Sequence, residues 1–155
     1  MSLPPFPADY RASGLLLHVT SLPSPYGIGD VGPAAVAWID RLHDARQTWW
    51  QALPLGPTGY GDSPYQSLSS FAGNSLLVSP DWLIEDELVK PRDCVGSFSA
   101  TVVDFDAVKR FKYGLLETAW RNFSAGTRPD LRPAFERFAQ DQAHWLDDYA
   151  LFRAL

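Results

Sequence analysis

The residues best suited to chemistry lie together in one loop rich in glycine and proline, residues 56–66. Tyr60 and Tyr65 stand five positions apart and flank Asp62 and Ser63. Aromatic rings stack on the apolar faces of sugar rings, and a short acid or hydroxyl beside them can bind sugar hydroxyls. The loop therefore predicts a carbohydrate contact. The alternative is a turn in which the aromatic residues have no role.

A second pattern suggests a different ligand. Gly27, Gly29 and Gly32 satisfy G-x-G-x-x-G between a predicted strand and a predicted helix, as in a dinucleotide-binding turn. Against this, Pro23 and Pro25 lengthen the connection, and the second predicted strand ends without an acidic residue for the ribose. Dinucleotide binding is thus the last-ranked interpretation.

The remaining polar residues do not group into a further site. The histidines are dispersed and Cys94 has no nearby partner at zinc-like spacing, so we expect no bound metal. His43 falls on a polar helix face. His18, at a strand end, either lines a site or is a hydrogen-bonded core histidine.

Two acidic groups are best interpreted as solvated helix surface. One is the run at residues 85–87. The other is the pair Asp147 and Asp148, which are adjacent and would point about 100° apart on a helix. They cannot form the facing carboxylate pair that glycosyl transfer needs.

The elements around the first two loops form a β-α-β unit. Residues 15–19 are a short apolar run typical of a strand buried on both faces. An apolar stripe predicts a helix from Pro33 to about residue 46, and residues 48–55 predict a second strand. In such a unit, the loops at 20–30 and 56–66 lie at the same ligand-binding edge.

The second half of the chain predicts helices. One begins at Pro80 with Ser79 as its cap, and another runs from Asp104 towards Gly126. A last helix is expected from Asp130 to the end of the chain, with a rhythm that only Gln142 breaks. Because this pattern still runs at the last residue, we expect the unit to be truncated there.

Composition narrows the class of partner. The chain has 155 residues, a net charge of -5 and a pI near 5.0, which argues against nucleic acid and anionic membranes as partners. No apolar run approaches the roughly 18 residues of a membrane span. The single cysteine fits a reducing compartment, so we expect a cytoplasmic protein.

Four segments together resemble one known family. They are residues 11–30 (RASGLLLHVTSLPSPYGIGD), 53–67 (LPLGPTGYGDSPYQS), 71–74 (FAGN) and 144–152 (HWLDDYALF). They are similar to amino-terminal motifs of the 4-alpha-glucanotransferases, the amylomaltases or disproportionating enzymes of glycoside hydrolase family 77. The resemblance covers nearly all of the chain from Arg11 onward.

The resemblance implies an α/β fold, the first β-α-β portion of an elaborated (β/α)8 TIM barrel followed by a mainly helical insertion. A complete barrel takes about 250 residues, so the barrel here is incomplete. The expected parts are an N-terminal extension over residues 1–10, the start of the barrel with its glucan-binding loops over 11–74, and a truncated helical subdomain over 75–155.

The family's activity would cut an α-1,4-glucan and pass the freed segment to the 4-hydroxyl of glucose or another glucan. In this retaining double displacement, an aspartate forms a glycosyl ester and a glutamate protonates the leaving oxygen. No cofactor is implied. The implied partners are maltooligosaccharides, amylose, glycogen-derived glucans and glucose.

The resemblance also assigns the loop residues. Tyr65 would stack near the transferred sugar, with Ser63 and Asp62 in polar contacts around it, and Tyr60 would make a secondary glucan contact. The family's catalytic carboxylates match no residue of this chain, so we expect the chain alone to be inactive. The alternative is a non-catalytic α-glucan-binding module or remnant that uses Tyr26 together with Tyr60 and Tyr65.

Overall fold

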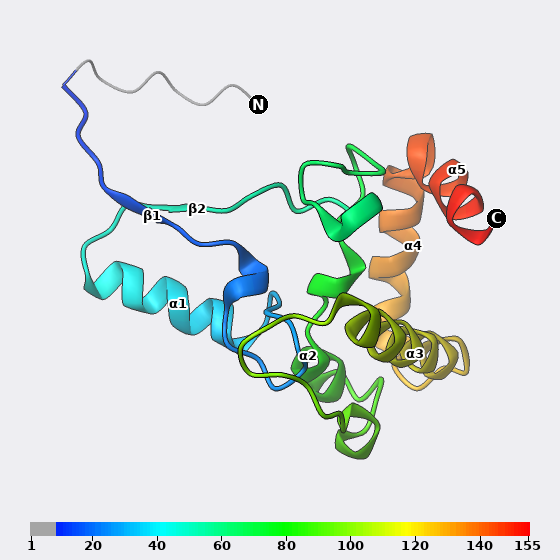
Figure 1. Cartoon of the computed structure of the whole chain (residues 1–155). Helices are drawn as coiled ribbons and strands as arrows, with labels where there is room; N and C mark the ends of the chain where they lie inside the picture. Colours follow the sequence, from blue (N-terminus) through cyan, green and yellow to red (C-terminus); the bar gives the residue numbers. More distant parts are fainter. Residues whose placement is uncertain (1–8) are drawn as a thin grey trace.

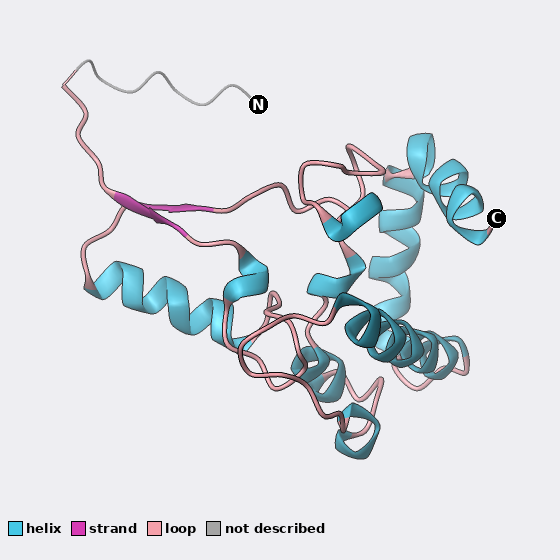
Figure 2. Cartoon of the chain, in the orientation of Figure 1, coloured by secondary structure: helices cyan, strands magenta, loops and turns pink. Residues whose placement is uncertain are grey.

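The computed structural model describes residues 9–155, so most of the predicted N-terminal extension lies outside the described residues. Helices and long loops make up most of the described chain, and its strands form a small parallel pair (Figure 2). The pair and α1 lie at one end of the molecule, and α3, α4 and α5 lie at the other (Figure 1).

The predicted β-α-β unit is present. Strand β1 (Gly14–Leu16) pairs in parallel with β2 (Trp49–Gln51), and α1 (Pro33–Asp44) connects them. The helix begins where the sequence indicates, because Gly32 is its N-cap and Pro33 needs no intrahelical amide partner. After the helix, Arg46 adopts a positive φ of 56° and turns the chain into β2.

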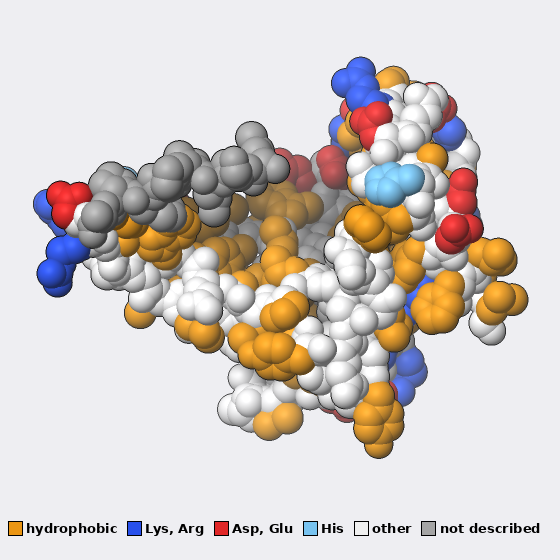
Figure 3. All heavy atoms as spheres, turned by 90° about the horizontal axis from the view of Figure 1, so that it is seen from above, with side chains coloured by type: hydrophobic (Ala, Val, Ile, Leu, Met, Phe, Trp, Pro, Cys, Tyr) orange, Lys and Arg blue, Asp and Glu red, His pale blue; other side chains and the backbone are white. Residues whose placement is uncertain are grey.

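The prediction that the first strand is buried on both faces is wrong. Leu15 and Leu16 are 47% and 58% exposed. Among the described residues, β1 pairs with β2 alone, so no further strand or helix layer covers both faces. Hydrophobic side chains are accordingly visible at the surface in the view from above (Figure 3).

The core of this end lies just after β1. Val19, in a 3-10 turn, and Leu22 are buried against Ala35 of α1 and Leu77. The indole nitrogen of Trp50 donates to the carbonyl of Leu17 at 2.7 Å, which ties the end of β1 to β2.

The helical half begins with α2 (Pro80–Glu85) and α3 (Phe105–Ser124). Both start as predicted: Pro80 is the first residue of α2, and the Asp104 carboxylate accepts a 2.9 Å hydrogen bond from the amide of Ala107. Ser79 is the N-cap of α2, but its side chain makes no capping bond. Most of the apolar face predicted for α3 is buried, including Val108, Leu115, Ala119 and Phe123.

The single long helix predicted after Asp130 is wrong. The chain forms α4 (Arg132–Asp141) and α5 (Ala143–Ala154), which turn away from each other at Gln142 (Figure 1). The side-chain oxygen of Gln142 accepts a 2.7 Å hydrogen bond from the Trp145 indole. This polar residue is the one that interrupts the apolar spacing.

Tyr26 belongs to the core. The alternative interpretation that placed it in a glucan-binding surface with Tyr60 and Tyr65 is therefore wrong for this residue. Its ring is buried and lies 6.1 Å from Phe111 in a stacked arrangement, and its hydroxyl donates to Asp81 at 2.6 Å. Burial and the neighbouring carboxylate raise the pKa of this hydroxyl. The side chain therefore links the loop after β1 to α2 and α3.

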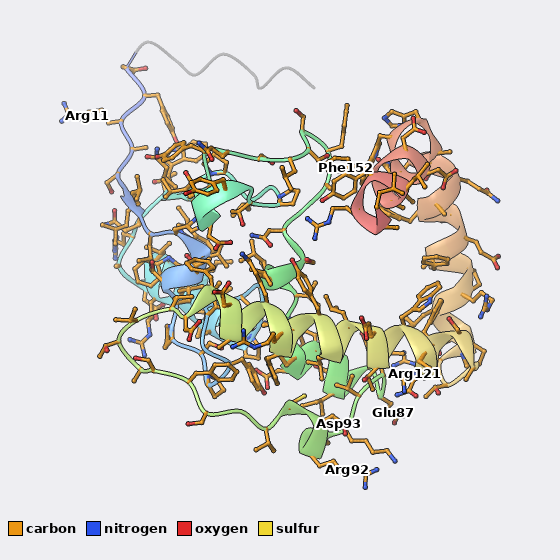
Figure 4. All side chains as sticks on the ribbon, turned by 45° about the vertical axis from the view of Figure 1, so that its right-hand side comes forward. Arg11, Glu87, Arg92, Asp93, Arg121 and Phe152 are labelled. Atoms are coloured by element: carbon orange, nitrogen blue, oxygen red, sulfur yellow. The ribbon has the colours of Figure 1, made fainter. Side chains whose placement is uncertain are left out.

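The surface residues largely follow the sequence. His43 is exposed on α1, and Glu85 and Glu87 are exposed around the end of α2, although Asp86 accepts a 3.3 Å bond from Arg128. Arg92 and Asp93 pair at the surface of the next turn (Figure 4). No helix in the described part of the chain combines the length and apolar character needed to cross a bilayer.

Candidate functional site

The tyrosine loop, residues 58–67, is closed at its base by backbone pairing. Thr58 and Ser67 form an isolated antiparallel bridge, and the amide of Gly59 donates to the carbonyl of Gln66 at 2.8 Å. The amide of Leu68 donates to the carbonyl of Pro57 at 2.9 Å just outside the bridge. These bonds hold the two strands of chain at the base of the loop together, so the two ends of the tip are fixed relative to each other.

The tip turns sharply and presents its rings to solvent. Tyr60–Asp62 form a 3-10 turn in which Gly61 and Asp62 have positive φ values of 69° and 55°. Tyr60 is 93% exposed and Tyr65 is 73% exposed. Two accessible aromatic faces on one short loop are suited to stacking on a ligand with flat apolar faces.

The two polar residues between the tyrosines also contact protein atoms. The Asp62 carboxylate lies 2.7 Å from the Lys109 ammonium and accepts a 3.3 Å bond from the Thr58 hydroxyl. The Ser63 hydroxyl oxygen accepts from the amide of Tyr65 at 3.3 Å. The loop thus brings all four predicted site residues together, with Asp62 facing α3.

Two cavities adjoin this loop. One of about 410 Å³ is bounded by residues 54–56 and 69–73, including Phe71, which stacks 5.9 Å from Trp145 of α5. A smaller one of about 140 Å³ lies between Thr58, Lys109 and Tyr113. The loop is therefore flanked by hollows on the side of α3 and α5.

The loop after β1 borders a separate cavity of about 590 Å³, lined by residues 20–24, 27–29 and 99–103 with Phe105. Its glycines allow close approach of neighbouring atoms, backbone at Gly29 and a side chain at Gly27. A Cβ on Gly29 would lie 2.1 Å from the carbonyl oxygen of Val19, and one on Gly27 would overlap the ring of Phe98. The same pattern of glycines is thus accounted for without a bound dinucleotide.

The start of α1 is also poorly suited to a phosphate. Asp30 is buried just before it, and a Cβ on Gly32 would come within 2.7 Å of the Asp30 carboxylate. The Asp30 carboxylate, which pairs with Lys112, and the Ser79 hydroxyl crowd the backbone at Gly32, where a phosphate would have to approach.

His18 lies at the end of β1, partly buried, with its Nδ1 atom enclosed and without a hydrogen-bond partner. Desolvation by burial lowers the pKa of the imidazole. The sequence left two alternatives for His18, a residue that lines a site and a hydrogen-bonded core histidine. The second does not fit, because Nδ1 has no hydrogen-bond partner. No group of three potential metal ligands occurs within residues 9–155.

Comparison with known proteins decides the family. A family model described as 4-alpha-glucanotransferase matches residues 17–155. The chain belongs to this family. Its relatives include the 4-alpha-glucanotransferases of Thermus thermophilus, 48% identical over 145 residues, and of Synechocystis, 45% identical over 149 residues. The alignments cover 94% and 95% of this chain but 29% and 30% of the relatives, so the chain spans under a third of their length.

A solved member of the 4-alpha-glucanotransferase family has the same fold over this stretch. It is an amylomaltase from Streptococcus agalactiae, described in complex with acarbose, which superposes with a TM-score of 0.84 at 38% identity. The match covers 94% of this chain and 29% of that one. The motif-based identification of the family from residues 11–30 and 53–67 is confirmed.

Two lysines of α3 in this glucanotransferase segment were missed by sequence reasoning. Lys112 is buried and pairs with Asp30, and Lys109 pairs with Asp62. The signal for Lys112 was available, because it stands four residues after Val108 and three before Leu115 on the buried face. Lys109 carried no such signal, because its partner lies 47 residues away in an irregular loop.

Proposed function

We propose that this chain supplies part of the glucan-binding wall of a 4-alpha-glucanotransferase. The observation that carries the proposal is the pair of exposed rings, Tyr60 and Tyr65, on one loop with a closed base. In the proposal, Tyr65 stacks near the sugar that is transferred, and Tyr60 makes a secondary contact with the glucan.

The polar residues of the loop complete the proposed contact. The Ser63 hydroxyl can donate its proton to a sugar oxygen while its own oxygen accepts from Tyr65. A carboxylate has about four acceptor positions, so Asp62 can accept a sugar hydroxyl in addition to its bonds from Lys109 and Thr58. A polar rim beside aromatic faces is the usual composition of a small-molecule site.

The comparisons support a glucan as the ligand. The amylomaltase with 38% identity is described in complex with acarbose, a ligand of the α-glucan oligosaccharide class. The family description and the two bacterial relatives point to the same chemistry. We propose that the partners of this chain are maltooligosaccharides, amylose, glycogen-derived glucans and glucose. We also propose that it acts in the cytoplasm.

In the proposed fold of the whole enzyme, the β1-α1-β2 unit is the first part of an elaborated (β/α)8 barrel. The parallel pairing of β1 with β2 through α1 supports this placement, as does the likeness to the amylomaltase. Residues 11–74 would then be barrel with its loops, and residues 75–155 a helical subdomain.

The proposed reaction is a retaining double displacement that moves a glucan segment onto a 4-hydroxyl. No residue of this chain is assigned as its nucleophile or its acid. The part of this chain is to hold the donor glucan, because binding energy from sugars beside the cleaved bond can be used to orient and distort the reacting one. Alone, the chain is expected to bind glucan without turning it over.

A paired assay of the 155-residue chain tests this proposal. Calorimetric titration with maltoheptaose should give measurable binding, and incubation with maltotriose should release no glucose. Binding without transfer is the expected pair of results. Glucose release would contradict the assignment of all catalytic groups outside this chain, and absence of maltoheptaose binding would contradict the glucan-binding role.

A further inference from the structure

The tip of the tyrosine loop has little packing of its own. A Cβ placed on Gly61 would meet nothing within 4 Å, and the ring of Tyr60 is almost fully exposed. Within the tip, the amide of Asp62 donates to the carbonyl of Gly59 at 3.3 Å, and the amide of Gln66 donates to the carbonyl of Ser63 at 3.1 Å. These bonds shape the turn, but they do not join it to the rest of the molecule.

One ion pair joins the tip to the helical half. The Lys109 ammonium lies 2.7 Å from one carboxylate oxygen of Asp62 and donates to the other at 2.9 Å. The two side chains are 32% and 15% exposed, so the pair is partly shielded from water. A charge-assisted contact of this length in such a setting is stronger than an exposed surface pair.

The contact also holds an uncommon backbone. Asp62 adopts a left-handed conformation with φ of 55°, directly after Gly61 with φ of 69°. Residues other than glycine rarely adopt this conformation, although aspartate and asparagine do so more readily than most. The Thr58 hydroxyl adds a 3.3 Å bond to the same Asp62 carboxylate. The turn that orients both tyrosines is thus fastened at Asp62.

The other end of the ion pair is rigid. Lys109 lies on the second turn of α3, whose N-terminus is capped by Asp104. The residue before it, Val108, is completely buried, and Lys112 one turn later is held by Asp30. The backbone of α3 at Lys109 is therefore held in place by the core. The ion pair can in turn hold Asp62 in a defined position relative to that core.

We propose that Lys109 is a positioning residue for glucan binding, acting through Asp62 to hold Tyr60 and Tyr65 in the conformation that receives the sugar chain. Lys109 itself need not touch the glucan. The inference rests on the proposed function of the tyrosine loop, and it adds a specific element, α3, on which the loop depends.

Hydrogen exchange of the loop amides tests the positioning role without any glucan. The amides of Gly59 and Leu68 donate at the loop base, and the amide of Gln66 donates to the carbonyl of Ser63 inside the loop. In Lys109→Met these amides and those of the tip should exchange about fivefold faster, as expected when about 1 kcal/mol of local restraint is lost. Exchange in α3 should stay unchanged. Unaltered exchange in the loop would overturn the proposal.

Two matched variants control this measurement. Arg110→Met removes a cation from the next position of α3, where the side chain is exposed, and should leave the loop amides as in the unaltered chain. Lys109→Arg keeps the charge and should restore most of the protection. If Arg110→Met accelerates loop exchange as much as Lys109→Met, a general charge effect replaces the ion pair as the cause.

Glucan affinity supplies the second readout. Lys109→Met should weaken maltoheptaose binding about fivefold. Asp62→Asn should weaken it at least as much, because it breaks the same ion pair and also changes the direct sugar contact, and the double variant should lose no more than Asp62→Asn alone. Asparagine keeps the tendency towards positive φ, so the second variant tests the carboxylate. Additive losses would contradict the positioning role.

Tyr65→Ala separates the two proposals. Unchanged affinity in this variant would contradict the glucan site, while the hydrogen-exchange result still decides the role of Lys109.

Discussion

The ammonium of Lys112 lies 3.0 Å from the carboxylate of Asp30, 82 residues earlier in the chain, and both side chains are buried, 1% and 6% exposed. Lys112 also donates to the carbonyl of Val78 at 2.7 Å. Burial raises the pKa of Asp30 and lowers that of Lys112, and the attraction between them opposes both shifts. The pair fastens the loop after β1 to α3.

Removal of the cation alone should be strongly destabilising. Lys112→Met leaves the Asp30 carboxylate buried without its partner, and breaking a buried pair in this way lowers the free energy of unfolding by about 3–5 kcal/mol. Urea denaturation followed by circular dichroism measures the change. Lys112→Met combined with Asp30→Asn removes both charges and should recover more than half of the loss. A single variant as stable as the unaltered chain would contradict this account.

Substitution of Gly29 should show that this glycine is required for close packing of the backbone. In Gly29→Ala the added Cβ would lie 2.1 Å from the Val19 carbonyl oxygen and close to Leu22, so the backbone must shift and stability should fall by about 2 kcal/mol. The matched control is Gly114→Ala within α3, where a Cβ meets nothing within 4 Å. It should raise stability by about 0.5–1 kcal/mol. The midpoint of thermal unfolding reports both, and a neutral Gly29→Ala would contradict the close approach.

Tyr26 should behave as a core residue. Tyr26→Phe keeps the ring against Phe111 but removes the hydroxyl that donates to Asp81. Losing a hydrogen bond to a charged acceptor should cost about 2 kcal/mol of unfolding free energy. Glucan affinity should remain unchanged, as measured by calorimetry under conditions where the variant is folded. A clear loss of affinity would return Tyr26 to the binding surface.

His18 should give the chain an acid-sensitive stability. Because desolvation lowers the pKa of His18 in the folded state, the unfolded chain binds the proton more readily. This contribution is complete above the ordinary histidine pKa of about 6.5 and is lost as the pH falls towards the folded-state value. His18→Gln should flatten the stability profile as the pH falls below about 6.5. A profile for His18→Gln identical to that of the unaltered chain would refute the assignment.

Local patterns in the sequence were sufficient for most elements. Gly32 and Pro33 marked the start of α1, and Asp104 marked the start of α3, because caps act within one turn. Gln142 indicated the break between α4 and α5, because it interrupts the apolar spacing, but it was interpreted as a polar position within one continuous helix. Apolar spacing alone does not distinguish an interrupted helix from two helices.

Long-range packing was beyond local patterns. Tyr26 resembled Tyr60 and Tyr65 in its loop of prolines and glycines, yet its ring is buried because α2 and α3 fold over it. Leu15 and Leu16 were expected inside a sheet, but their burial depends on neighbours that the described residues do not supply. The four loop residues were predicted from motif and chemistry, while Lys109, which holds one of them, required the structure.

The most direct test of the glucan-binding loop is the maltoheptaose affinity of Tyr65→Ala beside Tyr65→Phe. The ring of Tyr65 is 73% exposed, so neither change should disturb the core. Tyr65→Ala should weaken binding at least about tenfold, because the stacking face is lost, and Tyr65→Phe should retain most of the affinity. Equal affinity of Tyr65→Ala and the unaltered chain would contradict the central claim.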